Sequence, residues 1–267
     1  MSRGRSEQVL ARRVTEAGAV DQGRRPDEVI VEEPLEIRLD GVRVATTMRT
    51  PGHDFELAIG FCFTDGLLAG APVLTCRYCG TGSAVETEFN VVSVDTGGVA
   101  PEPAARLGTT SSSCGICGST QLDDLRDRLE PLPAHEPWDP QVLYTVTEKV
   151  RAEQELFTRT GSAHAAASFD RTGAIDLVRE DIGRHNAVDK VVGRLHLDGR
   201  LPATGQGLFV SGRASFEMVQ KAWAAGFEAV IAVSAPSALA VETATAAGLT
   251  LAGFVRGDAF NLYAPAL

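Results

Sequence analysis

The chain has 267 residues, 44% of them hydrophobic and 22% charged, so it can bury a substantial core in one large or two modest domains. A formal net charge of −10 and a pI near 5.0 argue against a nucleic-acid-binding protein, although local arginines could still hold a small anion. No run of about 18 apolar residues is present, so we expect no membrane partner. Five cysteines and no signal-peptide pattern predict a cytoplasmic protein whose paired thiols are catalytic or metal-bound.

The arginine-rich residues 1–25 carry no apolar periodicity, and we expect a disordered tail there. Residues 26–110 predict a small α+β domain, in which two strands, a helix and two further strands follow one another. The first two strands form a hairpin because Asp40-Gly41 is a strong two-residue turn signal, and Asp54 is placed to cap the helix. The predicted hairpin, helix and later strands span residues 29–49, 55–66, 73–79 and 86–94.

Residues 111–140 predict a loop with two cysteines, a short helix and a linker rich in proline. Cys114 and Cys117 are three positions apart, and small residues around them leave both thiols accessible. A thiol just before a helix meets unpaired backbone N–H groups, which lower its pKa to about 3.5–7.5 from about 8.5. We therefore expect Cys114 to be a reactive sulfur carrier on a mobile loop.

Cys76 and Cys79 form a second cysteine pair, which allows a different interpretation of Cys114 and Cys117. The two pairs together could form a four-thiolate zinc site. The segment between them is longer than in compact zinc ribbons, and it contains a predicted strand, which argues against this alternative. The fifth cysteine, Cys62, lies on the apolar face of its predicted helix and is expected in the core.

Residues 141–267 predict an α/β domain, in which alternating strands and helices favour parallel strand pairing and a three-layer sandwich. We expect helices over residues 141–159, 186–195, 214–224 and 237–247, and strands over 164–169, 174–178, 207–210, 230–234 and 249–255.

Ligands of open parallel sheets bind at the carboxyl ends of strands, where helix N-termini present free N–H groups. Two hydroxyl-rich turns follow predicted strands here, and a third strand end adds Arg256 before Gly257. Arginine suits a phosphate-bearing or nucleotide ligand. The alternative is that the serines only cap helices. The candidate residues of the two turns are Ser211, Gly212, Arg213, Ser234 and Ser237.

Residues 179–190 are unusually rich in ionisable side chains for a strand-to-helix turn. Asp189 lies four residues after His185, so a hydrogen bond on one helix face could tune His185 as a base or ligand contact. An ordinary solvated capping region is the alternative. A zinc deaminase needs His-x-Glu, whereas His164 is followed by two alanines, which argues against deaminase chemistry even on a shared scaffold.

Several stretches together resemble the formate dehydrogenase accessory sulfurtransferase family, FdhD. They follow one another in the order expected of that family, at residues 33–35, 50–61, 113–118, 160–166, 179–190 and 211–213. The resemblance implies that a cysteine desulfurase loads a persulfide onto the protein. The protein would then pass the sulfur to the molybdenum of a bis-molybdopterin guanine dinucleotide cofactor needed by formate dehydrogenase.

The same resemblance assigns the persulfide to Cys114 and a less settled role to Cys117, and it implies a homodimer and a cytidine-deaminase-like main domain. Its terminal cofactor-binding segment corresponds to Phe254, Val255, Arg256, Gly257, Asp258 and Ala259. The expected function is therefore sulfur transfer through a cysteine persulfide. The alternatives are a non-catalytic chaperone that binds the cofactor and a structural zinc protein.

Overall fold

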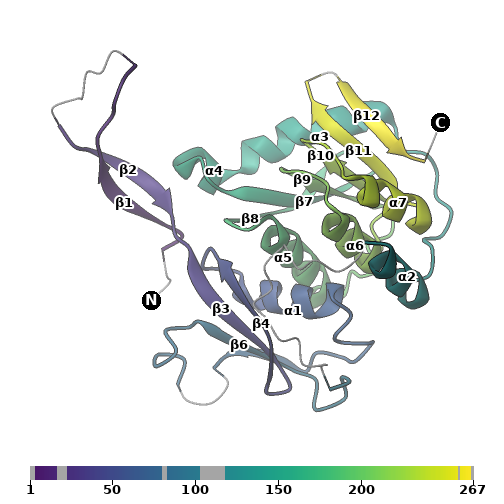
Figure 1. Cartoon of the computed structure of the whole chain (residues 1–267), viewed down its shortest axis with the longest axis horizontal. Helices are drawn as coiled ribbons and strands as arrows, with labels where there is room; N and C mark the ends of the chain where they lie inside the picture. Colours follow the sequence, from purple (N-terminus) through teal and green to yellow (C-terminus); the bar gives the residue numbers. More distant parts are fainter. Residues whose placement is uncertain (1–3, 17–22, 80–82, 103–117, 258, 266–267) are drawn as a thin grey trace.

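The computed structural model describes residues 4–16, 23–79, 83–102, 118–257 and 259–265. The described strands form three sheets, with two, four and six strands (Figure 1). In the described ranges, no helix is long and apolar enough to cross a membrane.

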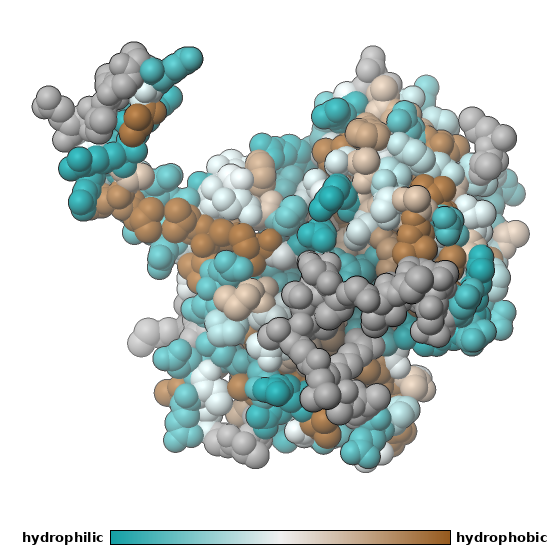
Figure 2. Space-filling view, viewed as in Figure 1, coloured by the Kyte–Doolittle hydropathy of each residue, from teal (hydrophilic) through white to brown (hydrophobic). Residues whose placement is uncertain are grey.

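The two-stranded sheet is an arm that projects away from the two larger sheets (Figure 1). In it, β1 (Ser6–Ala11) pairs antiparallel with β2 (Arg25–Ile30). Within the stretch 1–25, for which a disordered tail was expected, residues 6–11 are therefore an ordered strand, which corrects that expectation for the described part of the stretch. The side chains of the arm are mostly exposed, so β1 has no alternation of buried and exposed residues to predict a strand. Figure 2 shows apolar side chains along the arm, among which Leu10 is 61% exposed.

The four-stranded sheet belongs to the small N-terminal unit and has the order β4-β3-β6-β5. The expected hairpin is present, and Asp40 and Gly41 both adopt the positive φ that a tight turn of this kind needs. Strand β6 begins later than predicted, because Glu88 and Phe89 have positive φ and form a turn. The elements are β3 (Glu33–Leu39), β4 (Val42–Arg49), α1 (Asp54–Thr64), β5 (Thr75–Tyr78) and β6 (Val91–Asp95).

The cap of α1 differs from the prediction. His53, in a left-handed conformation, is the N-cap residue, and Asp54 is the first residue of the helix. The carboxylate of Asp54 instead pairs with the guanidinium of Arg49 at 2.9 Å, and both side chains are buried. A buried arginine needs a carboxylate partner, and Asp54 supplies it.

The six-stranded sheet has the order β12-β11-β10-β9-β7-β8. Parallel pairing, expected from the alternation of strands and helices, is confirmed for β9, β10 and β11. A tight turn joins β7 to β8, so these two strands are antiparallel. The connection through α5 gives β9 the direction of β8, so β7 is antiparallel to β9 as well. An unpredicted last strand, β12, runs antiparallel to β11. The strands are β7 (His164–Asp170), β8 (Ile175–Asp181), β9 (Gln206–Val210), β10 (Ala229–Ala232), β11 (Thr250–Arg256) and β12 (Ala259–Ala264).

Helices cover both faces of this sheet. One apolar cluster joins the sheet to α3, and another joins its opposite face to α5, α6 and α7. The likeness of this arrangement to the cytidine-deaminase sandwich stays a prediction. The helices are α2 (Gly118–Arg128), α3 (Pro140–Glu153), α4 (Glu155–Thr160), α5 (Arg184–Leu197), α6 (Phe216–Ala225) and α7 (Ala238–Ala247).

The single helix predicted over 141–159 is two helices, which meet at Gln154. The carboxylate of Glu180 accepts hydrogen bonds at 2.8 Å from the backbone N–H groups of Leu156 and Phe157. These amides lie in the first turn of α4, where no intrahelical acceptor exists, so a buried side chain from β8 fixes the new helix start.

The small unit and the main sheet meet where α1 packs against α5 (Figure 1). The two helices touch through glycines. A Cβ atom on Gly60 would lie 1.9 Å from the carbonyl oxygen of Asp189, and one on Gly193 would lie 1.8 Å from that of Glu56. Only glycine permits this separation of the helix backbones, so the two units form one closely packed body.

Candidate functional site

The turns that follow β9 and β10 and the last residues of β11 lie side by side at the carboxyl edge of the main sheet. The backbone N–H of Ser234 donates to the carbonyl of Gly212 at 3.3 Å, and that of Phe254 donates to the carbonyl of Ser234 at 3.2 Å. An isolated bridge joins Ala214 to Pro236. The structure therefore brings together the predicted residues of both hydroxyl-rich turns and the start of the terminal segment. We call this row of turns the carboxyl edge.

The serines of the carboxyl edge have different roles. Ser237 caps α7, because its hydroxyl accepts from the N–H of Ala240 at 3.2 Å, as the capping alternative expected. The hydroxyl of Ser211 accepts from the N–H of Ala165 at 2.9 Å and so ties the first turn to β7. Ser215 precedes α6 without capping it, and its buried Oγ has no hydrogen-bond partner in the described ranges. A buried hydroxyl without a partner can bind a ligand.

The terminal segment begins at a strained residue. Phe254 has a φ of 57°, which is unusual for a bulky side chain, and it lies at an irregularity in the pairing of β11 with β12. The side chain of Val255 is fully buried beneath α3, so only its backbone is available to a ligand. Arg256 is exposed at the end of β11, and Gly257 has a φ of 62°. Ala259 begins β12, whereas Asp258 lies outside the described residues.

His185 lies in the first turn of α5 and forms an ion pair with Glu217 in the first turn of α6. This hydrogen bond lowers the pKa of Glu217 below its ordinary value. The possible hydrogen bond between His185 and Asp189, one of the two alternatives for this stretch, is not formed. Asp189 faces away from the carboxyl edge, where it accepts from Lys221 at 2.8 Å and from Thr64 at 2.9 Å. A buried carboxylate takes the nearest buried cation, which the helical spacing alone did not identify.

Two residues that the sequence analysis did not assign to the site, His164 and Arg184, also lie beside the carboxyl edge, and Arg184 adds positive charge. His164 begins β7 beside Gly212, where a Cβ atom would lie 3.7 Å from the imidazole. Burial lowers the pKa of His164, and Arg184 and His185 lower it further, so the ring is neutral at pH 7. Arg184 begins α5, and its buried Nε has no hydrogen-bond partner among the described residues. In the sequence, His164 could be noticed only as a single histidine at the start of a predicted strand.

The carboxyl edge can hold an anion. Neither Arg184 nor Arg213 forms an ion pair with a described carboxylate, so both guanidinium groups remain available to phosphate oxygens. The N-termini of α5, α6 and α7 follow strands that end at this edge, and helix N-termini favour negative charge. These features are chemically suited to an anionic group.

The predicted catalytic residues Cys114 and Cys117 lie outside the described residues. Helix α2 begins at Gly118, immediately after Cys117 in the chain. Of the other cysteines, Cys62 is buried, and burial raises the pKa of Cys76 to about 12. A protonated thiol is a poor metal ligand. Across the described ranges, no group of three or more His, Cys, Asp or Glu residues is placed to hold a metal ion.

Comparisons with known proteins agree with this architecture. A relative named sulfur carrier protein FdhD from Corynebacterium efficiens is 46% identical over 253 residues and covers 90% of each chain. One of the same name from Streptomyces avermitilis is 48% identical over 249 residues, covering 90% of this chain and 88% of that one. The crystal structure of a formate dehydrogenase accessory protein from Desulfotalea psychrophila matches the fold with a TM-score of 0.75, at 22% identity over 98% of both chains. A family model described as FdhD/NarQ matches residues 30–266, and the chain belongs to this family.

Proposed function

We propose that this chain is a sulfur carrier for formate dehydrogenase. Sulfur from a cysteine desulfurase is held as a persulfide on Cys114 and is passed to the molybdenum of a bis-molybdopterin guanine dinucleotide cofactor. The observation that carries this proposal is membership of the FdhD/NarQ family, whose similar members are named sulfur carriers. The carboxyl edge is suited to anions, which supports a nucleotide-containing cofactor as the molecule that receives the sulfur.

The incoming step conserves electrons. The thiolate of Cys114 attacks the terminal sulfur of the desulfurase persulfide, a new S–S bond forms, and the desulfurase cysteine leaves as a thiolate. In the outgoing step the S–S bond of the Cys114 persulfide breaks, both electrons of that bond stay on Cys114 as a thiolate, and the outer sulfur becomes bound to the metal of the cargo. That sulfur gains two electrons, which the receiving metal centre supplies. The proposal assigns no step to Cys117, the second thiol of the predicted loop.

The cargo ends in nucleotides that carry pyrophosphate groups, so its binding site needs several donors for anions. Arg213 and Arg184 can each bind phosphate oxygens in a bidentate manner. The Oγ of Ser215, which has no hydrogen-bond partner among the described residues, and the turn at Gly212 add polar groups that can contact a phosphate. We place the nucleotide phosphates at the carboxyl edge, with the terminal segment from Phe254 along one side.

The decisive experiment maps the persulfide. The purified chain is incubated with a cysteine desulfurase and free cysteine, and peptides are then analysed by mass spectrometry for one added sulfur atom. We expect the label on Cys114, no label in Cys114→Ser, and a label on Cys114 in the control Cys76→Ser. Absence of sulfur from Cys114 in the wild-type chain would contradict the proposal.

A chaperone that only binds the cofactor is the second candidate, because the carboxyl edge is complete without either thiol of the loop. The two functions separate in one variant. A carrier with Cys114→Ala still binds guanine nucleotide and no longer activates formate dehydrogenase, whereas a chaperone with the same change does both. The homodimer implied by the family and the cytoplasmic location expected from the cysteines both stay predictions.

A further inference from the structure

Strand β8 forms one edge of the main sheet, and the hydrogen bonds of its neighbour show which of its backbone groups face outward. The carbonyl of Ala165 accepts from the N–H of Ser211, so the backbone N–H and C=O groups of Ala165 in β7 point toward β9. The backbone N–H and C=O groups of successive residues point to opposite sides of a strand. Those of Ala166 therefore point toward β8, where Ala166 pairs with Arg179. The residues on either side of Arg179, Val178 and Glu180, therefore direct their N–H and C=O groups away from the sheet.

Side chains confirm this direction. Arg179 donates to the carbonyl of Val178 at 2.9 Å, and Arg5, at the base of the arm, donates to the carbonyl of Glu180 at 3.1 Å. A guanidinium group only donates hydrogen bonds, so it can bind a backbone carbonyl oxygen but cannot accept a hydrogen bond from a backbone N–H. The outward N–H groups of Val178 and Glu180 have no acceptor among the described residues, and β8 pairs with β7 alone among the described strands.

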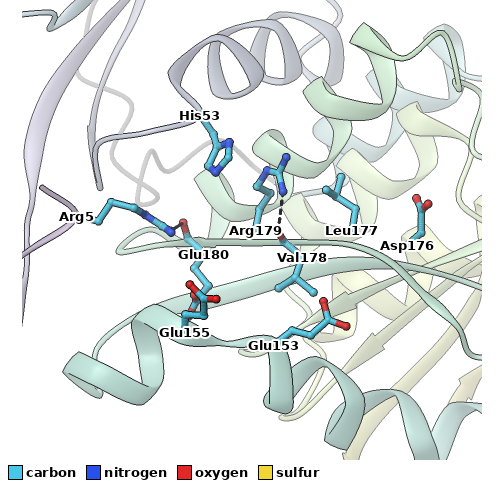
Figure 3. A pocket seen from close by; sticks show the side chains of 9 residues that line it. All are labelled: Arg5, His53, Glu153, Glu155, Asp176, Leu177, Val178, Arg179 and Glu180. Atoms are coloured by element: carbon cyan, nitrogen blue, oxygen red, sulfur yellow. Dashed lines mark hydrogen bonds between the residues drawn. The ribbon is translucent and has the colours of Figure 1, made fainter. Parts of the chain in front are cut away.

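A groove runs along this edge. Five consecutive residues of β8, from Asp176 to Glu180, line a cavity of about 330 Å³, and the arm, α1 and the junction of α3 with α4 close its sides (Figure 3). At about 3.3 Å per residue, the lined length of β8 accommodates roughly five residues of an extended chain. The groove is lined by other residues than the carboxyl edge.

The groove is acidic where it is open. Glu153 and Glu155 are exposed on the side formed by α3 and α4, and neither forms an ion pair in the part of the chain that the structure describes (Figure 3). By contrast, Arg179 is neutralised by Glu56, with N–O distances of 2.6 and 2.9 Å. Arg5 also lines the groove and has no carboxylate partner among the described residues, but it is a single cation held at the carbonyl of Glu180. The two unpaired carboxylates outnumber it and favour a ligand with positive charge.

We propose that the β8 groove binds an extended, basic peptide segment of a partner protein, which adds to the sheet as a further strand. The backbone of the peptide accepts hydrogen bonds from the amides of Val178 and Glu180. It also donates to their carbonyls, each of which has a second lone pair beside its arginine contact. Lysine or arginine side chains of the peptide face Glu153 and Glu155.

The experiment measures binding of a fluorescently labelled peptide that alternates lysine and valine. Val178→Pro removes one outward amide, and proline is tolerated on a strand edge where the N–H faces solvent. Val178→Ala is the matched control, since it shortens the same side chain and keeps the amide. We expect binding to the wild-type chain and to Val178→Ala, and a loss of about tenfold or more in Val178→Pro.

Charge is tested separately. The pair Glu153→Gln and Glu155→Gln should weaken binding by about threefold to tenfold, whereas Glu148→Gln, the same change on α3 outside the groove, should have no effect. A peptide with glutamate in place of lysine should not bind. If Val178→Pro fails to fold, a lysine peptide with N-methylated backbone amides tests the reciprocal hydrogen bonds, from the peptide amides to the carbonyls of β8, on the wild-type chain, and we expect no binding.

Three outcomes would overturn the proposal. The first is failure of the lysine peptide to bind the wild-type chain. The second is equal binding by Val178→Pro and Val178→Ala. The third is self-association of the wild-type chain that Val178→Pro abolishes while the peptide does not bind, which would make a second copy the occupant of the groove. Persulfide formation on Cys114 is unaffected by each of them, so the proposed function is tested independently.

Discussion

Replacement of Lys221 by methionine should destabilise the protein severely, because it leaves a carboxylate buried without its cation. The ammonium of Lys221 lies 2.8 and 3.0 Å from the carboxylate oxygens of Asp189 and 2.9 Å from the hydroxyl of Thr64. The two charged side chains are only 7% and 3% exposed. Removal of one partner from such a pair costs about 3–5 kcal/mol, and in a chain of this size that corresponds to a fall in Tm of about 6–20 °C.

Thermal unfolding followed by circular dichroism measures this change. Arg194→Met is the matched control, since Arg194 pairs with Asp198 on α5 at 2.7 Å while remaining 44% exposed. That exposed pair should contribute no more than about 0.5 kcal/mol. Asp189→Asn combined with Lys221→Met should lose less stability than the sum of the single changes, with a coupling of about 2 kcal/mol. Equal small losses in Lys221→Met and Arg194→Met would refute the reasoning.

Other predictions concern the same packing. Gly193→Ala places a Cβ atom 1.8 Å from a carbonyl oxygen of α1 and should cost about 3 kcal/mol or more, whereas Gly23→Ala, with open space around it, should leave Tm unchanged. Burial raises the pKa of Glu56, but hydrogen bonds from basic neighbours, above all Arg179, outweigh it and lower the pKa to about 2. The resulting stability, about 2 kcal/mol after allowance for solvent screening, is complete above pH 4.5 and is lost as the pH falls toward 2. Acid titration of Tm should show this loss in the wild-type chain and a smaller one in Arg179→Met. Ser237→Ala should cost about 1 kcal/mol in urea unfolding, because it removes the cap of α7, and an unchanged midpoint would contradict the assigned cap.

Local signals predicted most elements of the fold. The hairpin turn at Asp40 and Gly41 and the spacing of apolar residues in α5 depend on neighbours in the sequence, and both predictions were confirmed. Strand β1 could not be found in this way, because its residues are exposed and its order comes from pairing with β2 across the arm. The cap of α1 was missed for a related reason, since the buried Arg49 engages Asp54.

The candidate site was predicted only in part. The rule that ligands bind at the carboxyl ends of parallel strands identified the turns at Ser211 and Ser234, which the structure places side by side. It could not identify His164, which begins a strand. That residue reaches the same edge because β7 runs antiparallel to β9, a pairing that the alternation of strands and helices did not reveal. The assignment of Cys114 as the sulfur carrier stays a prediction.

The stretch at residues 179–190 combines two tasks, which the structure separates by side-chain direction. One group is buried and reaches the small N-terminal unit through Thr50, Met48 or Thr64: Asp181, Asn186, Asp189 and Lys190. The other group, Arg184 and His185, lies at the start of α5 beside the carboxyl edge.

Loss of sulfur transfer after a substitution in this stretch therefore has two distinct physical causes. A change in the first group separates α1 from α5 and should lower Tm together with activity. A change such as Arg184→Gln should weaken nucleotide binding and leave Tm within about 1 °C, because the half-buried guanidinium of Arg184 forms no ion pair with a described residue whose loss would cost stability. The density of ionisable residues thus reflects the assembly of two structural units as much as chemistry at the site.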